Sequence, residues 1–196
     1  MAAETNRETN RSSLTLLIIA GSVKEKMMRI ALICLFIIST AYAGDVPYRF
    51  FKPSAELLIT ALNEAESEAD PDARMILQTG REMTLDEKAI VIGGCWDYVD
   101  AVYTRAGFPR DRRRVVFQGT LENGPYADID ALRPGDWVYH INHSYNGIQH
   151  SGIFIKWLDK RNAIGLLLSY RGEKSNQPAR YRGYDLSNVY TITRAK

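Results

Sequence analysis

Cysteine is scarce in this chain of 196 residues, which contains only Cys34 and Cys95. Long apolar runs are lacking as well: the longest covers residues 30–43, whereas a helix needs about 20 apolar residues to cross a membrane. Neither sign of charge dominates, because 25 basic side chains stand against 23 acidic ones. The scarcity of cysteine excludes a disulfide framework. The short apolar run argues against a permanent membrane anchor, and the balanced charge argues against phosphate-driven binding of nucleic acid.

The first 43 residues have the pattern of a leader. A basic start at Arg29 precedes the apolar run, which ends in Ala41-Tyr42-Ala43, the small-x-small pattern that signal peptidase reads. We expect residues 1–27 to be an upstream extension that is not native, and residues 28–43 to be a signal peptide cleaved after Ala43. Residues 44–196 then form a single exported domain, periplasmic or extracellular and monomeric.

Charge is distributed unevenly along the exported part. Residues 44–100 carry five basic and twelve acidic side chains, whereas residues 101–196 carry fifteen basic and eight acidic ones. Either salt bridges join the two halves, or the second half presents a basic face to an anionic polymer. The run Arg112-Arg113-Arg114 is interpreted most simply as a solvated loop.

Helical patterns fill the first half of the domain. Apolar residues recur at helical spacing over residues 54–69, with Ser54 as N-cap and Asp70-Pro71 as the stop. Further helical turns are predicted to end at Gly80, and Thr84 with Glu87 has the spacing of a capping box. Another helix is expected to begin at Cys95 and to stop at Gly107 and Pro109.

The second half has strand patterns instead. Strand-forming residues follow a Pro-Gly-Asp turn, and the predicted strands cover residues 133–142, 150–157, 163–170 and 189–194. Helices followed by an antiparallel series of strands are typical of the α+β class. We therefore expect the helix that begins at Cys95 to pack on one face of an antiparallel sheet.

Cys95 is the candidate nucleophile. It follows Gly93 and Gly94 at the first turn of the predicted helix, where unpaired N–H groups and the helix dipole favour a thiolate. Asp97 and Asp100 oppose this effect with negative charge, so a cationic partner is needed. The domain offers three histidines, and His150 is our choice because it opens a strand that can hold its imidazole rigidly. We expect the pKa of the Cys95 thiol to be lowered.

Three segments resemble cell-wall cysteine peptidases and amidases of the NlpC and CHAP types. They are GGCWDYVDAVYTRAGFPR, LRPGDWVYHI and HSGIFI, in this order within residues 81–194. The resemblance implies a papain-like fold with Cys95 as nucleophile and His150 as base. It also implies an amide substrate, in peptidoglycan stem peptides, with no cofactor and no metal ion.

The third polar residue of the site is less well defined in this sequence. In the families that the chain resembles, it lies on the strand after the histidine strand, which makes Ser169 the candidate because strand alternation lets only one of Leu168 and Ser169 face His150. Tyr170 is the alternative if a bulge shifts the register. If neither side chain serves, a backbone carbonyl or a water molecule must hold the imidazole. The family's oxyanion tyrosine has no counterpart here, since Ile90 stands at the nearest position.

Two other functions stay open from the sequence. An exported papain-like binding module without activity would use Asp136, Trp137 and Tyr139 as ligand contacts, whereas the hydrolase makes them turn, core and groove-wall residues. A metal protein would ligate Zn²⁺ through His140 and His143 together with His150 or Cys95.

Overall fold

The structure is a computed structural model that describes residues 52–196. The predicted upstream extension, the signal peptide and its cleavage after Ala43 lie outside the described residues. Within the described part, no helix combines the length and the apolar character that a membrane crossing requires.

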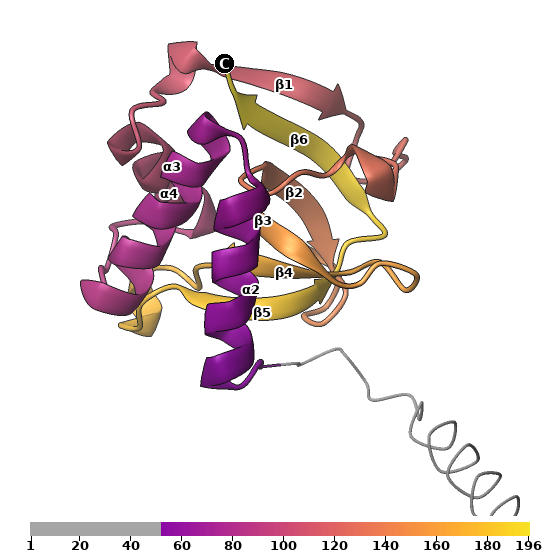
Figure 1. Cartoon of the computed structure of the whole chain (residues 1–196). Coiled ribbons are helices and arrows are strands. Elements are labelled where there is room, and N and C mark those ends of the chain that lie inside the picture. Colours follow the sequence, from indigo (N-terminus) through magenta and orange to yellow (C-terminus); the bar gives the residue numbers. More distant parts are fainter. Residues whose placement is uncertain (1–51) are drawn as a thin grey trace, which may run out of the picture. The chain divides into compact units, whose positions relative to one another are not determined.

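Helices and an antiparallel sheet make up this part of the chain, which confirms the α+β class (Figure 1). The three α-helices lie against one face of the sheet and precede all of its strands in the sequence. The helices are α2 (Ala55–Glu68), α3 (Pro71–Arg81) and α4 (Cys95–Arg105). The strands are β1 (Arg113–Gln118), β2 (Trp137–Asn142), β3 (Ile148–Asp159), β4 (Ile164–Ser169), β5 (Arg180–Asp185) and β6 (Val189–Ala195).

Side-chain caps start the first two helices. Ser54 Oγ accepts a hydrogen bond of 3.3 Å from the Leu57 amide, as predicted, and Asp70 Oδ1 accepts one of 2.9 Å from the Ala73 amide. The capping box predicted at Thr84 and Glu87 is wrong. A π-helical turn, Glu82–Asp86, continues α3 through this segment, and the chain up to Gly94 is irregular.

All neighbouring strands of the sheet are antiparallel, in the order β1-β6-β2-β3-β4-β5. The four predicted strands correspond to β2, β3, β4 and β6. The two edge strands, β1 and β5, were not predicted, because arginines occupy several of their positions and lower their resemblance to strands. An edge strand tolerates such charge since one of its sides faces solvent.

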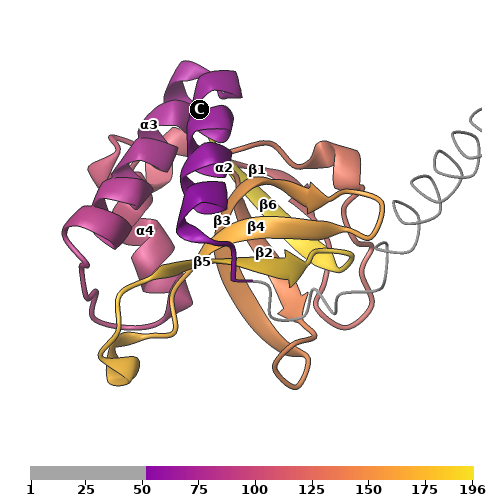
Figure 2. The same cartoon turned by 60° about the horizontal axis from the view of Figure 1, so that its bottom comes forward.

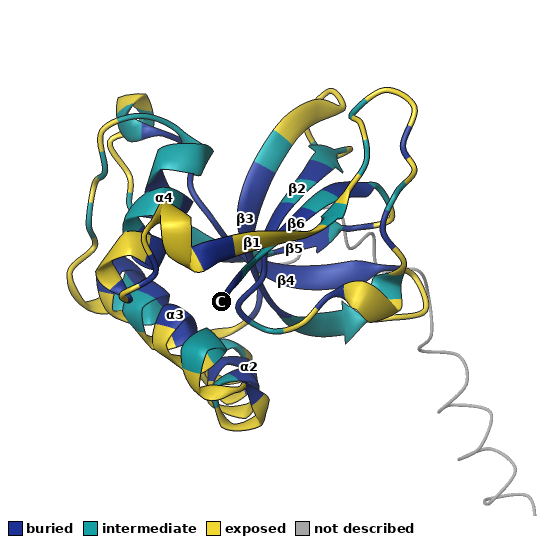
Figure 3. Cartoon of the chain, turned by 90° about the horizontal axis from the view of Figure 1, so that it is seen from above, coloured by how far each residue is buried: buried dark blue, intermediate teal, exposed yellow. Residues whose placement is uncertain are grey.

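Helix α4, which begins at Cys95, is fixed to the start of β2. The Tyr103 hydroxyl donates a hydrogen bond of 2.6 Å to the Gly135 carbonyl and accepts one of 3.0 Å from the Trp137 amide. Tyr103 is fully buried between α4 and the sheet, and Figure 3 shows buried residues along the inner side of this helix. This anchor sets the position of Cys95 relative to the strands.

The prediction of a solvated loop at Arg112-Arg113-Arg114 is wrong for its central residue. Arg113 begins β1 and is buried, and its guanidinium donates to Asp100 Oδ1 at 2.7 Å, to Thr104 Oγ1 at 2.9 Å and to two backbone carbonyls. Arg112 and Arg114 are exposed. The difference follows from their places in the chain, because Arg112 ends the 3-10 turn Arg110–Arg112, Arg113 is the first residue of β1 and contacts α4, and Arg114 points away from it.

Ion pairs join the acidic first half to the basic second half. The pairs are Arg105 with Glu82 and Glu87, Arg110 and Arg113 with Asp100, and Lys156 with Glu64. Part of the uneven charge is therefore neutralised within the fold, as expected if salt bridges join the two halves.

Candidate functional site

Two glycines allow Cys95 to open α4. Gly93 has a φ of 108°, and a Cβ atom added there would lie 2.2 Å from an oxygen of Asp97. The Gly93 carbonyl accepts a hydrogen bond of 2.9 Å from the Glu173 amide, which ties this turn to the loop after β4. Cys95, the first residue of the helix, is partly exposed as a result.

The two carboxylates near the nucleophile are both engaged. Asp97 Oδ2 accepts a hydrogen bond of 2.7 Å from the Gly94 amide, and Asp100 pairs with Arg113. The amides of Cys95 and Trp96 belong to the first turn of α4, where the helix itself provides no acceptor. They are therefore the candidate donors to an oxyanion formed at Cys95. Ile90, which stands nearest to the position of the oxyanion tyrosine in the families named above, has no hydroxyl to donate.

The Cys95 thiol is poised to ionise near neutral pH. Burial raises its pKa, but a hydrogen bond with His150, the charge of that imidazole and contacts with Ser151 outweigh burial and hold the pKa at about 7. The structure thus brings together Cys95 and His150, the pair expected from the sequence. A substantial share of the thiol is thiolate at neutral pH, which is the reactive form.

A chain of hydroxyl groups holds the other side of the imidazole. His150 Nε2 lies 2.8 Å from Ser169 Oγ, which in turn lies 2.8 Å from the Tyr184 hydroxyl. Ser169 and Tyr184 are buried, and Ser169 pairs in register with Gly152. If Nε2–H donates to Ser169, Nδ1 is left free to exchange a proton with the thiol.

Tyr170 does not contact His150. It is buried on the helix side of the sheet, where its hydroxyl donates a hydrogen bond of 2.8 Å to the Val91 carbonyl and its ring packs on Tyr98. The predicted alternation of β4 places Ser169 on the opposite face. Of the two side chains considered from the sequence, Ser169 is the one that contacts the imidazole.

His140 packs against His150 without competing for the thiol proton. The two rings meet edge to face, with centroids 5.6 Å apart and planes at 71°. His140 is fully buried, and burial followed by the charge of His150 lowers its pKa to about 3, so it is neutral at physiological pH. It can restrict the orientation of the His150 ring by contact.

Aromatic side chains line the sheet beside Cys95. Trp96 Nε1 donates a hydrogen bond of 2.9 Å to the Tyr139 hydroxyl, and the Trp137 ring packs against both rings. Trp137 is 2% exposed, and Asp136 is 1% exposed and pairs with Arg194. Burial makes Asp136 and Trp137 turn and core residues, whereas Trp96 and the partly exposed Tyr139 can border a groove.

The histidines do not converge as metal ligands. His143 is exposed, and its Nε2 lies 2.7 Å from Asn188 Oδ1. No three His, Cys, Asp or Glu side chains cluster in a metal-binding arrangement anywhere in residues 52–196. The ligand set of His140, His143 and either His150 or Cys95 is therefore not assembled.

Two residues of the site were missed in the sequence. Ser151 contributes to the lowered pKa of Cys95, and Tyr184 holds Ser169. Ser151 could have been suggested by its place next to His150. Tyr184 lies on β5, which the sequence did not predict as a strand, so no pattern placed it near the histidine.

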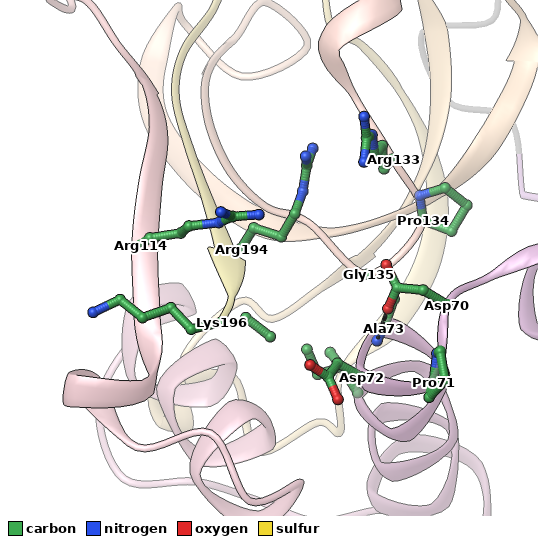
Figure 4. A pocket seen from close by; sticks show the side chains of 12 residues that line it. Asp70, Pro71, Asp72, Ala73, Arg114, Arg133, Pro134, Gly135, Arg194 and Lys196 are labelled. Atoms are coloured by element: carbon green, nitrogen blue, oxygen red, sulfur yellow. Dashed lines mark hydrogen bonds between the residues drawn. The ribbon is translucent and has the colours of Figure 1, made fainter.

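A separate basic pocket lies at the far ends of β2 and β6. The end of β2 and the start of β6, where His140 pairs with Val189, lie near the candidate site. The pocket, of about 380 Å³, lies at the other ends of these strands and is lined by residues that precede β2 and by the end of β6. Figure 4 shows Arg114, Arg133 and Arg194 around it, with Asp70 and Asp72 of the α3 start opposite. Arg194 is engaged by Asp136, which leaves Arg114, Arg133 and Lys196 as exposed cations remote from Cys95.

If Cys95 and His150 act as a catalytic pair, the hydroxyl chain gives a graded prediction for turnover. Ser169→Ala should slow turnover about two- to twelvefold, because it removes one neutral hydrogen bond worth about 0.5–1.5 kcal/mol. Tyr184→Phe should slow it by no more than that, because Tyr184 acts on the imidazole only through Ser169. Steady-state kcat measures both, and Tyr184→Phe should add little when Ser169→Ala is already present. Wild-type turnover by Ser169→Ala, or fully additive effects, would contradict a chain that works as one unit.

The arrangement combines the parts that acyl transfer needs. A thiol with a pKa near 7 contacts an imidazole, the imidazole has a fixed second partner, and free amides lie at the nucleophile. No family model, curated protein or solved structure matches this chain.

Proposed function

We propose that this protein is an exported cysteine hydrolase of the papain-like type that cleaves an amide bond in peptidoglycan stem peptides. The observation that carries the proposal is the contact of Cys95 with His150, which holds the thiol pKa at about 7 while Ser169 engages the far side of the imidazole. A lone reactive thiol is costly in an exported protein unless it is used.

The mechanism follows from these positions. His150 Nδ1 takes the thiol proton, and the Cys95 sulfur attacks the carbonyl carbon of the amide. The Cys95 and Trp96 amides stabilise the resulting oxyanion, an effect worth about 2.7–4 kcal/mol for each well-placed donor. The imidazolium then protonates the leaving amine as the carbon–nitrogen bond breaks. His150 next deprotonates a water molecule, which hydrolyses the thioester and releases Cys95.

The papain-like part of the proposal is supported by the order of the elements. The nucleophile opens a helix packed on an antiparallel sheet, and the base lies on a strand that comes later in the chain. The same order is found in the NlpC-type and CHAP-type enzymes that the sequence resembles. Peptidoglycan as substrate and export of the domain come from that resemblance and from the leader pattern.

Release of amines from purified peptidoglycan tests the function. The domain spanning residues 44–196 should generate new free amines and matching fragment masses, and Cys95→Ala should generate none because it lacks the nucleophile. Ser67→Ala is a suitable control, since this exposed serine lies on α2, outside the site. Peptidoglycan that is bound equally by wild type and Cys95→Ala, and cleaved by neither, would favour the binding module instead.

A further inference from the structure

Three arginines near the candidate site have no acidic partner. Arg171 follows β4 by two residues, and Arg180 and Arg182 lie on β5. Among residues 52–196, none of the three forms an ion pair with an aspartate or glutamate. Other arginines of the domain, such as Arg105, Arg113 and Arg194, are paired. Arg114 and Arg133 also lack an acidic partner, but they line the remote basic pocket, whereas these three lie on β5 and just after β4, next to the residue that holds His150.

The strand register puts these cations on the histidine side of the site. Ser169 pairs with Gly152 on β3 and with Arg180 on β5, so Arg180 lies directly across from the residue that holds His150. Arg182 lies two positions along β5 and shares the same face of the strand. β5 is an edge strand that pairs with β4 on one side and with no strand on the other (Figure 2).

The loop that carries Arg171 is tied to the nucleophile turn. Gly172 follows Arg171, and the next amide, that of Glu173, donates to the Gly93 carbonyl. Arg171 is exposed. The loop therefore brings a third cation close to the turn that precedes Cys95.

Arg180 also carries an unsatisfied donor. Its Nε is buried and has no hydrogen-bond acceptor, although the residue as a whole is partly exposed. A buried donor without a partner costs about 1–3 kcal/mol, which a bound acceptor would recover. Burial, followed by the charges of Arg182 and Arg171, lowers the pKa of Arg180, as expected for cations that lack a counter-ion.

We propose that Arg180, Arg182 and Arg171 form an anion subsite beside Cys95 and His150 that binds an anionic group of the substrate. A guanidinium matches the two oxygens of a carboxylate or a phosphate, and an anion there would supply the acceptor that Arg180 Nε lacks. This inference rests on the proposed function. It narrows the substrate class to amides that carry a free anionic group close to the scissile bond.

Alkylation of Cys95 by two reagents of similar size tests the subsite without any substrate. Iodoacetate is an anion and iodoacetamide is neutral, so the ratio of their rate constants reports cations near the sulfur. The double variant Arg180→Gln, Arg182→Gln should lower this ratio roughly threefold or more, because two charges are removed. The matched control Arg114→Gln, Arg133→Gln removes the same charge at the remote basic pocket and should leave the ratio unchanged.

The outcomes separate the subsite from the hydrolase. If Cys95 reacts with neither reagent at neutral pH, the proposed nucleophile fails. If it reacts with both, and the ratio is the same in the wild type and in the Arg180 and Arg182 double variant, only the subsite is refuted. A cooperative urea unfolding transition shows whether the double variant is folded. Arg182→Gln alone serves if it is not, with a smaller fall in the ratio expected.

Competition identifies the anion. Acetate and inorganic phosphate, each at matched ionic strength, should slow iodoacetate more in the wild type than in the double variant. Stronger protection by acetate indicates a carboxylate, and stronger protection by phosphate indicates a phosphate group. Equal slowing of wild type and double variant by both anions would overturn the subsite.

Discussion

Replacing His150 by alanine should lower amide turnover by about 10²- to 10⁴-fold, the range that general acid–base catalysis contributes. Loss of the imidazole removes both the base that activates Cys95 and the acid that protonates the leaving amine. The variant keeps the nucleophile and the backbone amides, so it should retain more activity than Cys95→Ala. Initial rates of amine release from peptidoglycan measure the difference.

The same substitution should also move the titration of Cys95. His150 lowers the thiol pKa to about 7 against the opposing effect of burial, so its removal raises the pKa toward the ordinary value near 9. Iodoacetamide reacts with the thiolate, and its rate rises through the thiol pKa. The midpoint of rate against pH should therefore shift upward by more than one unit in His150→Ala.

His143→Ala is the matched control for both measurements. This histidine is exposed and binds Asn188 rather than the site. It should leave turnover and the alkylation midpoint as in wild type. A midpoint that stays near 7 in His150→Ala, or that moves equally in His143→Ala, would disprove the assigned pair.

The sequence was sufficient to predict the centre of the site because each part lies in a local pattern. Paired glycines before an amphipathic helix placed Cys95 at a helix start, and alternation along one strand selected Ser169 over Leu168. The register then follows from a short connection between β3 and β4. Tyr184 could not be found in this way, because its contact with Ser169 depends on β5 pairing with β4, which is set by tertiary packing.

Spacing alone misled at Thr84 and Glu87. A capping box requires the first residue to leave the helical conformation, but here α3 continues through a π-helical turn. The Thr84 hydroxyl lies 3.1 Å from that of Tyr98, and Glu87 pairs with Arg105, so both side chains contact α4 rather than cap a helix. Tertiary partners on α4 outweighed the local signal.

Arg113 shows the largest gap between sequence and structure, and it yields the largest stability prediction. Arg113→Met should lower the free energy of unfolding by about 3 kcal/mol, the lower end of the range for removing one partner of a buried ion pair. The lower end applies because the Asp100 side chain is 24% exposed, whereas that of Arg113 is 5% exposed. Methionine preserves apolar volume, but it leaves Asp100 with only the exposed Arg110 and leaves Thr104 and two backbone carbonyls without their donor.

Urea unfolding of Arg113→Met and Arg114→Met measures this difference between neighbours. Arg114 is exposed on the same strand, so its replacement should change the free energy of unfolding by no more than about 0.5 kcal/mol. Equal effects of the two substitutions would mean that the buried pair adds nothing beyond ordinary surface charge. A larger effect at Arg113 would mean that this arginine helps to hold the second half of α4, away from Cys95, against the sheet. The guanidinium also lies 5.1 Å from the centre of the ring of Tyr103, the residue that fixes α4 to β2.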